Sequence, residues 1–173
     1  MSGEQQSITI RRLERGDLPA ALAIQSAAYP APLIEDEAAF ASRLALPDAC
    51  CLAAVRNGAL VAYLLAHGWP SQAPPPVGAV LTPPGLSEVL FIHDLAVSPA
   101  ARGSGVGGRL MERAFAWAAE RGFRSAELIA VEGAAPYWRS LGFAEGAIPE
   151  ELAAKVAAYG AQARWMTRPV RKA

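Results

Sequence analysis

One segment near the middle of the chain joins a strand pattern, a glycine-rich turn and a helix pattern, and it constrains the fold more than any other. Residues 89–97 are mostly apolar and rich in β-branched side chains, and Pro99 follows this run. Glycine occupies positions 103, 105, 107 and 108, after which small and apolar residues recur at helical spacing as far as Gly122. Glycine has no Cβ, and the first N–H groups of a helix have no internal partner, so such a turn brings backbone donors close to a ligand. The segment therefore predicts an anion site that suits a diphosphate.

Three kinds of phosphate-binding turn share features with this segment, and spacing separates them. Three of the glycines fit the dinucleotide fingerprint, but residues 99–102 separate the strand from the first glycine, and the next acidic candidate, Glu132, comes late. No Gly-Lys-Ser/Thr follows the glycines, which excludes a nucleoside triphosphate P-loop. The third pattern is Arg-x-x-Gly-x-Gly, which begins at Arg102 after a strand that ends in Leu-Ala-Val. A glycine-rich connection that binds nothing is the remaining alternative.

The third pattern resembles the acetyl-coenzyme A signature of the GNAT superfamily of N-acetyltransferases. The resemblance covers most of the chain, because residues 137–143 stand where the family has Phe-Tyr-x-x-x-Gly-Phe and the expected elements follow in the same order. It implies an α/β (α+β) fold in which a mostly antiparallel sheet of six or seven strands has helices on both faces and a central parallel pair splayed around acetyl-CoA. Residues 27–37, 60–69 and 92–97 also resemble the arylalkylamine N-acetyltransferase branch, whose relatives also acetylate polyamines.

Local patterns predict the other elements. Asp17 is expected to cap a helix that reaches Ala28, and Asn57-Gly58 predicts a hairpin. A second helix, with the acidic first turn Glu35-Asp36-Glu37, is expected over residues 34–46, and a Pro-rich surface loop over residues 69–85. The expected strands are residues 7–13, 50–56, 60–69, 89–97, 126–131 and 164–170, and further helices are expected within residues 133–143, where Gly142 ends the helix, and 149–160.

Composition limits the class of protein. A chain of 173 residues with 53% hydrophobic and 18% charged residues predicts one folded domain, at residues 7–170. Its formal net charge of zero provides no basic patch for nucleic acid or an anionic membrane surface. The adjacent Cys50 and Cys51 argue against a disulfide framework and favour a reducing compartment. Because the sequence shows no apolar signal or membrane-spanning segment, a cytoplasmic protein is expected. Two histidines without ligand-spaced Cys or acidic clusters predict no metal site.

Acetylation of an amine requires a base, because an alkylamine with a pKa of about 10.4 is protonated at pH 7 and has no free lone pair. His93 lies on the central strand and has a suitable reference pKa of about 6.5. A catalytic histidine of the arylalkylamine branch matches its position, while a core histidine is the alternative. Asp94 is expected to orient His93 or the substrate ammonium if a bulge brings both side chains to one face.

The resemblance also implies the remaining contacts. The backbone N–H of Leu95 is expected to polarise the thioester oxygen, and Leu95 and Val97 to pair with the pantetheine amides. The family commonly has a tyrosine that protonates the thiolate four residues before Gly-Phe, where this chain has Trp138, with Tyr137 one position earlier. Because one helical step rotates a side chain by about 100°, either Tyr137 replaces this acid, or Trp138 packs against CoA and another group protonates the sulfur. Weaker candidates for the acid are Tyr29 and Tyr63. The expected coenzyme contacts are Leu95, Ala96, Val97, Arg102, Gly103, Ser104, Gly105, Val106, Gly107, Gly108, Arg109 and Trp138.

The acceptor is the least constrained partner. Tyr29, Trp69, the Pro-rich loop and the acidic turn at residues 35–37 predict an aromatic, negatively charged cleft for an arylalkylamine or polyamine, or else they are core residues and a helix start. Two functions therefore stay open: an N-acetyltransferase in which a small primary amine attacks acetyl-CoA directly, and a CoA-binding sensor without turnover. A dinucleotide-binding protein is a remote third. A homodimer contact through the helix and strand after Pro149 is compatible with the pattern but not required by it.

Overall fold

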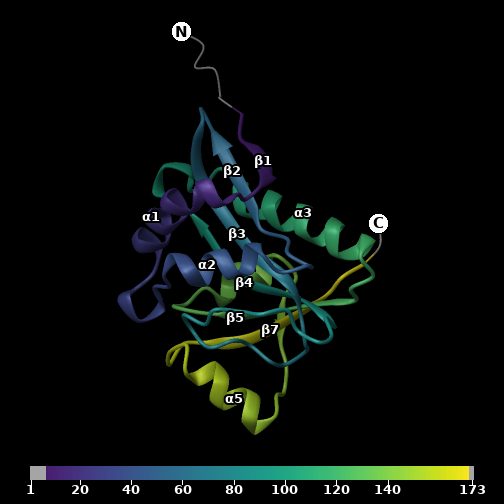
Figure 1. The fold of residues 1–173 in the computed structure, drawn as a ribbon. Helices are drawn as coiled ribbons and strands as arrows, with labels where there is room; N and C mark the ends of the chain where they lie inside the picture. The colour runs from purple at the N-terminus through teal and green to yellow at the C-terminus, as the bar shows by residue number, and fades with distance from the viewer. Residues whose placement is uncertain (1–6, 172–173) are drawn as a thin grey trace.

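The computed structural model describes residues 7–171, which form a seven-stranded sheet with helices on both faces (Figure 1). The strand order is β1-β2-β3-β4-β5-β7-β6, and all neighbouring strands are antiparallel except β4 and β5. This confirms the expected mixed sheet. The strands are β1 (Thr9–Arg12), β2 (Leu52–Arg56), β3 (Ala59–Trp69), β4 (Val89–Val97), β5 (Ser125–Ala130), β6 (Ala144–Glu145) and β7 (Arg164–Pro169). The helices are α1 (Leu18–Ala28), α2 (Glu37–Leu44), α3 (Val106–Glu120), α4 (Ala135–Ser140) and α5 (Glu150–Ala157), with 3-10 turns η1 (Arg15–Asp17), η2 (Ala31–Leu33) and η3 (Pro99–Ala101).

The helices bury two different faces of the sheet. Helices α3 and α4 pack on one face through the largest hydrophobic cluster, which includes Leu110 and Trp138. Helices α1 and α2 pack on the opposite face through Leu18 and Phe40. Helix α5 covers that second face further along the sheet, where Phe91 of β4 and Trp165 of β7 are buried. None of the helices in the described part of the chain is both long and apolar enough to span a bilayer.

Strand β4 contains a bulge, and the residue left out of the pairing is His93. Asp94 pairs with Leu65 of β3, but Ala66 of β3 pairs with Ile92, so one extra residue lies in β4 between the two pairs. A single extra residue reverses the alternation of side chains that follows it. His93 and Asp94 therefore both face the side of α1 and α2, as the resemblance implied.

The parallel pairing of β4 with β5 is short. It joins residues 90–92 to residues 126–128 and then stops, one residue before the bulge. Beyond Ile92, the edge of β4 that faces β5 has no strand partner among the described residues. The two strands separate at this point, as expected for a central splayed pair.

Some expected boundaries were wrong for local reasons. The second helix begins at Glu37, not at residue 34, because Asp36 is its N-cap and accepts the backbone N–H of Ala39 at 3.0 Å. Glu35 therefore lies in the extended segment before the helix. Asp17 stands at the start of α1 but does not cap it, since its carboxylate accepts the N–H of Glu14 and pairs with Arg11 at 2.7 Å. Strand β2 begins at residue 52 instead of 50, and the short β6 was not expected.

The Pro-rich loop between β3 and β4 is held against the sheet by side chains. Its prolines have no N–H, so few of its backbone groups can join a ladder. Instead, Leu81 N–H donates to Ser42 Oγ at 3.0 Å, and the backbone N–H of Gln72 donates to Glu127 at 2.9 Å. The hydroxyl of Tyr159 donates to the carbonyl of Pro75. The loop is therefore anchored to α2, β5 and the segment after α5.

Candidate active site

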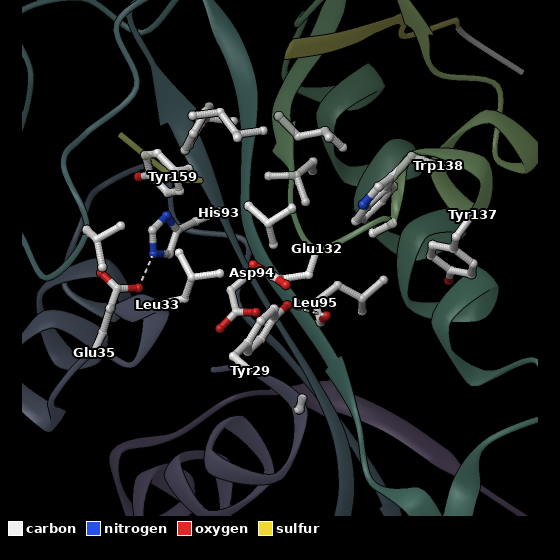
Figure 2. Close-up of a pocket in the computed structure, with 18 residues that line it drawn as sticks. Tyr29, Leu33, Glu35, His93, Asp94, Leu95, Glu132, Tyr137, Trp138 and Tyr159 are labelled. Carbon is white, nitrogen blue, oxygen red and sulfur yellow. Dashed lines mark hydrogen bonds and ion pairs between the residues drawn. The ribbon is translucent and has the colours of Figure 1, made fainter. Parts of the chain in front are cut away.

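A cavity of about 230 Å³ lies where β4 and β5 separate. Figure 2 shows Glu35 and His93 on one side of it, Trp138 and Tyr137 on the other, and Asp94 between them. All three expected catalytic residues thus line the same cavity. Its polar lining contains three carboxylates and no Lys or Arg among the described residues. The lining is made by Ala28, Tyr29, Leu33, Glu35, Val77, Phe91, Ile92, His93, Asp94, Leu95, Leu128, Ile129, Val131, Glu132, Ala134, Tyr137, Trp138 and Tyr159.

His93 contacts a carboxylate that is 58 residues away in the sequence. Its Nε2 lies 2.5 Å from Oε1 of Glu35. The two side chains are almost completely buried, at 3% and 5% exposure. The bulge turns His93 toward the segment between η2 and α2, and the late start of α2 leaves Glu35 free to reach it.

The second oxygen of Glu35 is also occupied. Oε2 accepts the backbone N–H of Gly78 at 2.7 Å and lies 3.7 Å from Nη2 of the fully buried Arg43. Burial by itself raises the pKa of Glu35, but the hydrogen bond with His93, the charges of His93 and Arg43, and the Gly78 N–H outweigh burial and lower this pKa. Glu35 is therefore an anion at neutral pH.

Asp94 lies beside this pair in a different environment. Its Oδ2 accepts the hydroxyl of Tyr63 at 2.6 Å, whereas its buried Oδ1 has no hydrogen-bond partner among the described residues. Burial raises the pKa of Asp94, and the charge of His93 and the Tyr63 hydrogen bond offset this only in part. The hydroxyl of Tyr29 donates to the carbonyl of Leu95 at 3.0 Å. Burial and the charge of Asp94 raise the pKa of both tyrosines well above the ordinary value, so both hydroxyls stay protonated.

The glycine-rich turn has the geometry that the sequence predicts. Gly103 and Gly105 have φ values of +78° and +77°, which glycine adopts without strain, and Gly105 is the N-cap of α3. Gly107 is constrained for a different reason: a Cβ there would lie 2.3 Å from Oη of Tyr137, so the tyrosine side chain would have to move. A Cβ at Gly108 would meet no atom within 4 Å. The first turn of α3 therefore has free backbone N–H groups, and at residues 107 and 108 no Cβ stands beside them.

Other expected coenzyme contacts flank this turn. Arg102 is exposed at the end of η3, and Ser104 Oγ donates to the carbonyl of Ala101 at 2.5 Å. The guanidinium of Arg109 donates to the carbonyl of Ile8, before β1, at 3.0 Å. Residues 96 and 97 continue β4 past the cavity lining. The expected contacts thus lie on β4, in the glycine-rich turn, in the first turn of α3 and on α4. The guanidinium of Arg109, however, is already bonded to the backbone carbonyl of Ile8.

The aromatic pair of α4 divides between two environments. Trp138 is 8% exposed and packs edge-on against Tyr137 and Phe143, each with ring centroids 5.4 Å apart. Tyr137 is 43% exposed, and its hydroxyl lies over Gly107 in the first turn of α3. Burial raises the pKa of Tyr137. Tyr137 is therefore a neutral hydroxyl on the side of the cavity formed by α3 and α4, opposite His93.

Trp69, which was expected in the acceptor cleft, lies outside the cavity lining, as do His67 and the two cysteines. The indole N–H of Trp69 donates to the carbonyl of Ala73 at 2.8 Å, and its ring packs against His67. His67 is fully buried, and burial lowers its pKa to about 3, so it stays neutral. Burial also makes poor nucleophiles of the cysteines, since it raises the pKa of Cys50 to about 12 and that of Cys51 to about 11. Within residues 7–171, no three His, Cys, Asp or Glu side chains are grouped as metal ligands.

Sequence reasoning missed the partners of His93. Glu35 was interpreted as part of an acidic turn that either borders the acceptor cleft or starts a helix, and Arg43 and Tyr159 were not considered. Asp36 offered a signal, since Asp is a preferred N-cap and would have placed Glu35 outside the helix. No local pattern pairs Glu35 with His93.

The comparisons with known proteins agree with this fold. The sequence matches the acetyltransferase (GNAT) family over residues 13–143. Similar solved structures include the ribosomal-protein-S18-alanine N-acetyltransferase from Escherichia coli, with 23% identity, a TM-score of 0.70 and coverage of 96% of both chains. A GCN5-related N-acetyltransferase from Kribbella flavida is 25% identical, with a TM-score of 0.64 and coverage of 94% of this chain and 97% of the other. The PaiA N-acetyltransferase from Thermoplasma acidophilum, in complex with coenzyme A, is 13% identical, with a TM-score of 0.67 and coverage of 94% and 99%. Among curated proteins no sequence matches.

The mixed sheet, whose one parallel pair opens at a bulge beside a glycine-rich helix start, is the fold that the matched N-acetyltransferase structures share. The family match spans more than half of the chain. The chain belongs to the acetyltransferase (GNAT) family.

Proposed function

We propose that residues 7–170 form a single N-acetyltransferase domain that moves the acetyl group of acetyl-CoA to the primary amine of a small molecule, by direct attack of the amine on the thioester. The observation that carries this proposal is the cavity at the opening between β4 and β5. It contains a histidine held by an anion, and it lies beside a helix start suited to a diphosphate. No metal is required for this chemistry.

The coenzyme side uses backbone groups and the aromatic pair. The N–H groups of residues 103–108 and the side chain of Arg102 bind the diphosphate, and Arg109 is a second phosphate contact if it leaves Ile8. The pantetheine arm lies along the unpaired edge of β4 at residues 95–97, where parallel pairing has stopped. The Leu95 N–H faces the thioester oxygen and stabilises its developing charge. Trp138 packs against the coenzyme.

The acceptor side supplies the proton transfers. His93 removes a proton from the bound ammonium, and Asp94 attracts the ammonium to the cavity, where the buried Oδ1 of Asp94 has no donor within residues 7–171. Tyr137 is the proposed proton donor to the departing thiolate, because it is neutral and lies at the coenzyme side.

The charge of the lining supports a cationic acceptor, such as an arylalkylamine or a polyamine. Glu35, Asp94 and Glu132 line the cavity, and no Lys or Arg of the described residues does. Two like charges about 8 Å apart at an effective dielectric constant of about 20 repel by about 2 kcal/mol, roughly thirtyfold in binding. An amine is therefore expected to be a better acceptor than the amino acid that carries an added α-carboxylate.

The test is a thiol-release assay with matched acceptors, tyramine against tyrosine and putrescine against ornithine. Saturable turnover of the amines, abolished by His93→Ala, supports the proposal. His67→Asn is the matched control, because the amide nitrogen of asparagine replaces the Nδ1 that contacts the Gly68 carbonyl, and this histidine lies outside the cavity.

A CoA-binding sensor without turnover is the second candidate, favoured by the tryptophan at the position where the family has its acid. Binding of CoA with no turnover of any amine would support the sensor. Thermal unfolding with CoA or NAD separates the dinucleotide alternative, since a ligand at 100 times its dissociation constant stabilises by about 2.7 kcal/mol.

A further inference from the structure

The two nitrogens of the His93 ring have different surroundings. Nε2 lies 2.5 Å from Oε1 of Glu35. Nδ1 makes no hydrogen bond among the described residues, and Figure 2 shows it turned away from Glu35, on the side of the ring where Tyr159 lies. Both His93 and Tyr159 line the cavity. One nitrogen is therefore engaged, and the other has no hydrogen-bond partner among the described residues and lies on the side of Tyr159.

Glu35 is fixed before any contact with His93 is counted. The buried side-chain amide of Gln25, on α1, accepts the backbone N–H of Glu35 at 2.8 Å and donates to its carbonyl at 2.9 Å. Asp36, the next residue, is tied to α2 as its N-cap. The side chain of Gln25, which is 1% exposed, thus binds both the backbone N–H and the backbone carbonyl of Glu35. Little freedom is left to its side chain, which is itself buried.

The surroundings of Glu35 also decide which of its oxygens meets His93. Oε2 faces two donors, the N–H of Gly78 and the guanidinium of Arg43, so it can act only as an acceptor. These donors and the hydrogen bond with His93 keep the carboxylate ionised despite its burial, which is the direction of its pKa shift. An ionised carboxylate is an acceptor at both oxygens. Nε2 must then carry a hydrogen.

We propose that Glu35 is the positioning residue of the site: its Oε1 accepts the Nε2–H of His93, and this leaves the Nδ1 lone pair as the base. The proposal rests on the function proposed above, in which His93 deprotonates the acceptor. In that step an N–H bond of the ammonium breaks and an Nδ1–H bond forms. The resulting imidazolium keeps its Nε2–H, and the carboxylate stabilises its charge without taking the proton.

Replacing Glu35 by glutamine gives an isosteric test. The glutamine must place its carbonyl oxygen against the N–H of Gly78, because its NH₂ would face the donors of Gly78 and Arg43. Its NH₂ then donates to His93 Nε2, and the proton of the neutral ring moves to Nδ1. In this tautomer the nitrogen that faces the cavity has no lone pair. Turnover should fall by about 10²- to 10⁴-fold in kcat, with the amine KM little changed.

The readout is the ¹⁵N NMR spectrum of histidine-labelled protein, with His67→Asn used to assign the two rings. The expected spectrum at a pH where the ring is neutral shows His93 with a protonated Nε2 and a bare Nδ1, and Glu35→Gln reverses the two. The matched control is Asp36→Asn, which removes the neighbouring charge but keeps a good N-cap. It should leave both the tautomer and kcat unchanged.

Each outcome decides the proposal. A wild-type ring protonated at Nδ1 overturns it, even if Glu35→Gln does not fold. A folded Glu35→Gln protein that keeps Nε2–H, or keeps kcat within about threefold, also overturns it. The NMR result needs no acceptor. If no amine is turned over, the proposed function fails, while the spectra alone establish or refute the positioning of His93 by Glu35.

Discussion

The contact between Tyr137 and Gly107 supports a quantitative prediction about the coenzyme side of the cavity. An alanine Cβ at Gly107 would lie 2.3 Å from Tyr137 Oη, 3.5 Å from Cζ and 3.7 Å from a methyl group of Leu95. Only the first distance is a clash. Removing the hydroxyl by Tyr137→Phe leaves ordinary contacts. The two substitutions should therefore be strongly coupled.

The magnitude follows from two opposing terms. Alanine in a helix is better than glycine by up to about 1 kcal/mol, whereas inserting a methyl group into an occupied space costs about 1–3 kcal/mol. Tyr137 is 43% exposed, so its ring can move and the cost lies in the lower half of that range. We expect Gly107→Ala to destabilise the wild type by about 1 kcal/mol and to stabilise the Tyr137→Phe protein by about 0.5–1 kcal/mol. The coupling free energy is then about 1.5–2 kcal/mol.

Urea unfolding of the four proteins in this cycle measures the coupling. Effects that add to within about 0.3–0.5 kcal/mol would show that the hydroxyl does not lie over the first turn of α3. The proposed role of Tyr137 would then lose its structural basis, because its placement at the coenzyme side depends on this contact.

Three further predictions concern the turn, the cavity and the thiols. Gly105→Ala, at a φ of +77°, should cost about 1–2 kcal/mol in urea unfolding and weaken CoA binding by calorimetry, whereas Gly146→Ala, whose Cβ meets open space, should do neither. Burial raises the pKa of Asp94, so the folded protein binds this proton more tightly than the unfolded chain, and stability is lost as the pH rises above the pKa of Asp94 in the unfolded chain. Asp94→Asn should therefore unfold at a higher temperature than wild type at pH 7, and this difference should shrink toward pH 4. A difference in unfolding temperature that does not depend on pH would contradict the reasoning. With pKa values raised to about 12 and about 11, Cys50 and Cys51 should resist a thiol-specific disulfide reagent at pH 8 until the protein is denatured, and fast reaction of the native protein would contradict their burial.

Much of the fold was predictable because its signals are local. The hairpin at Asn57-Gly58 has positive φ at both residues, as the dipeptide predicts. The order and type of the larger elements followed from periodicity, and several errors fell at element ends, as at the start of α2, where the side chain of Asp36 accepts a backbone N–H group. The two-residue strand β6 carries too few residues to show a period.

The candidate site was predictable only in part. His93 and Asp94 were expected from their positions on the central strand, and Tyr137 as the neighbour of the motif position that Trp138 occupies; all three line the cavity. Trp69 was expected there too, but its indole is bonded within its own loop. Spacing along the chain cannot show which side chains the Pro-rich loop covers.

The sequence by itself determined the strand, turn and helix that begin at Val89. The turn requires positive φ at residues 103 and 105, and glycine adopts this conformation without contacts to distant parts of the chain. Only the tertiary structure decided what surrounds His93. Its direction depends on a bulge in the pairing of β4 with β3, and its partner Glu35 is brought from 58 residues away by the packing of α1 and α2. Such contacts depend on register and on where a helix starts, and a shift of one residue in either would separate the two side chains.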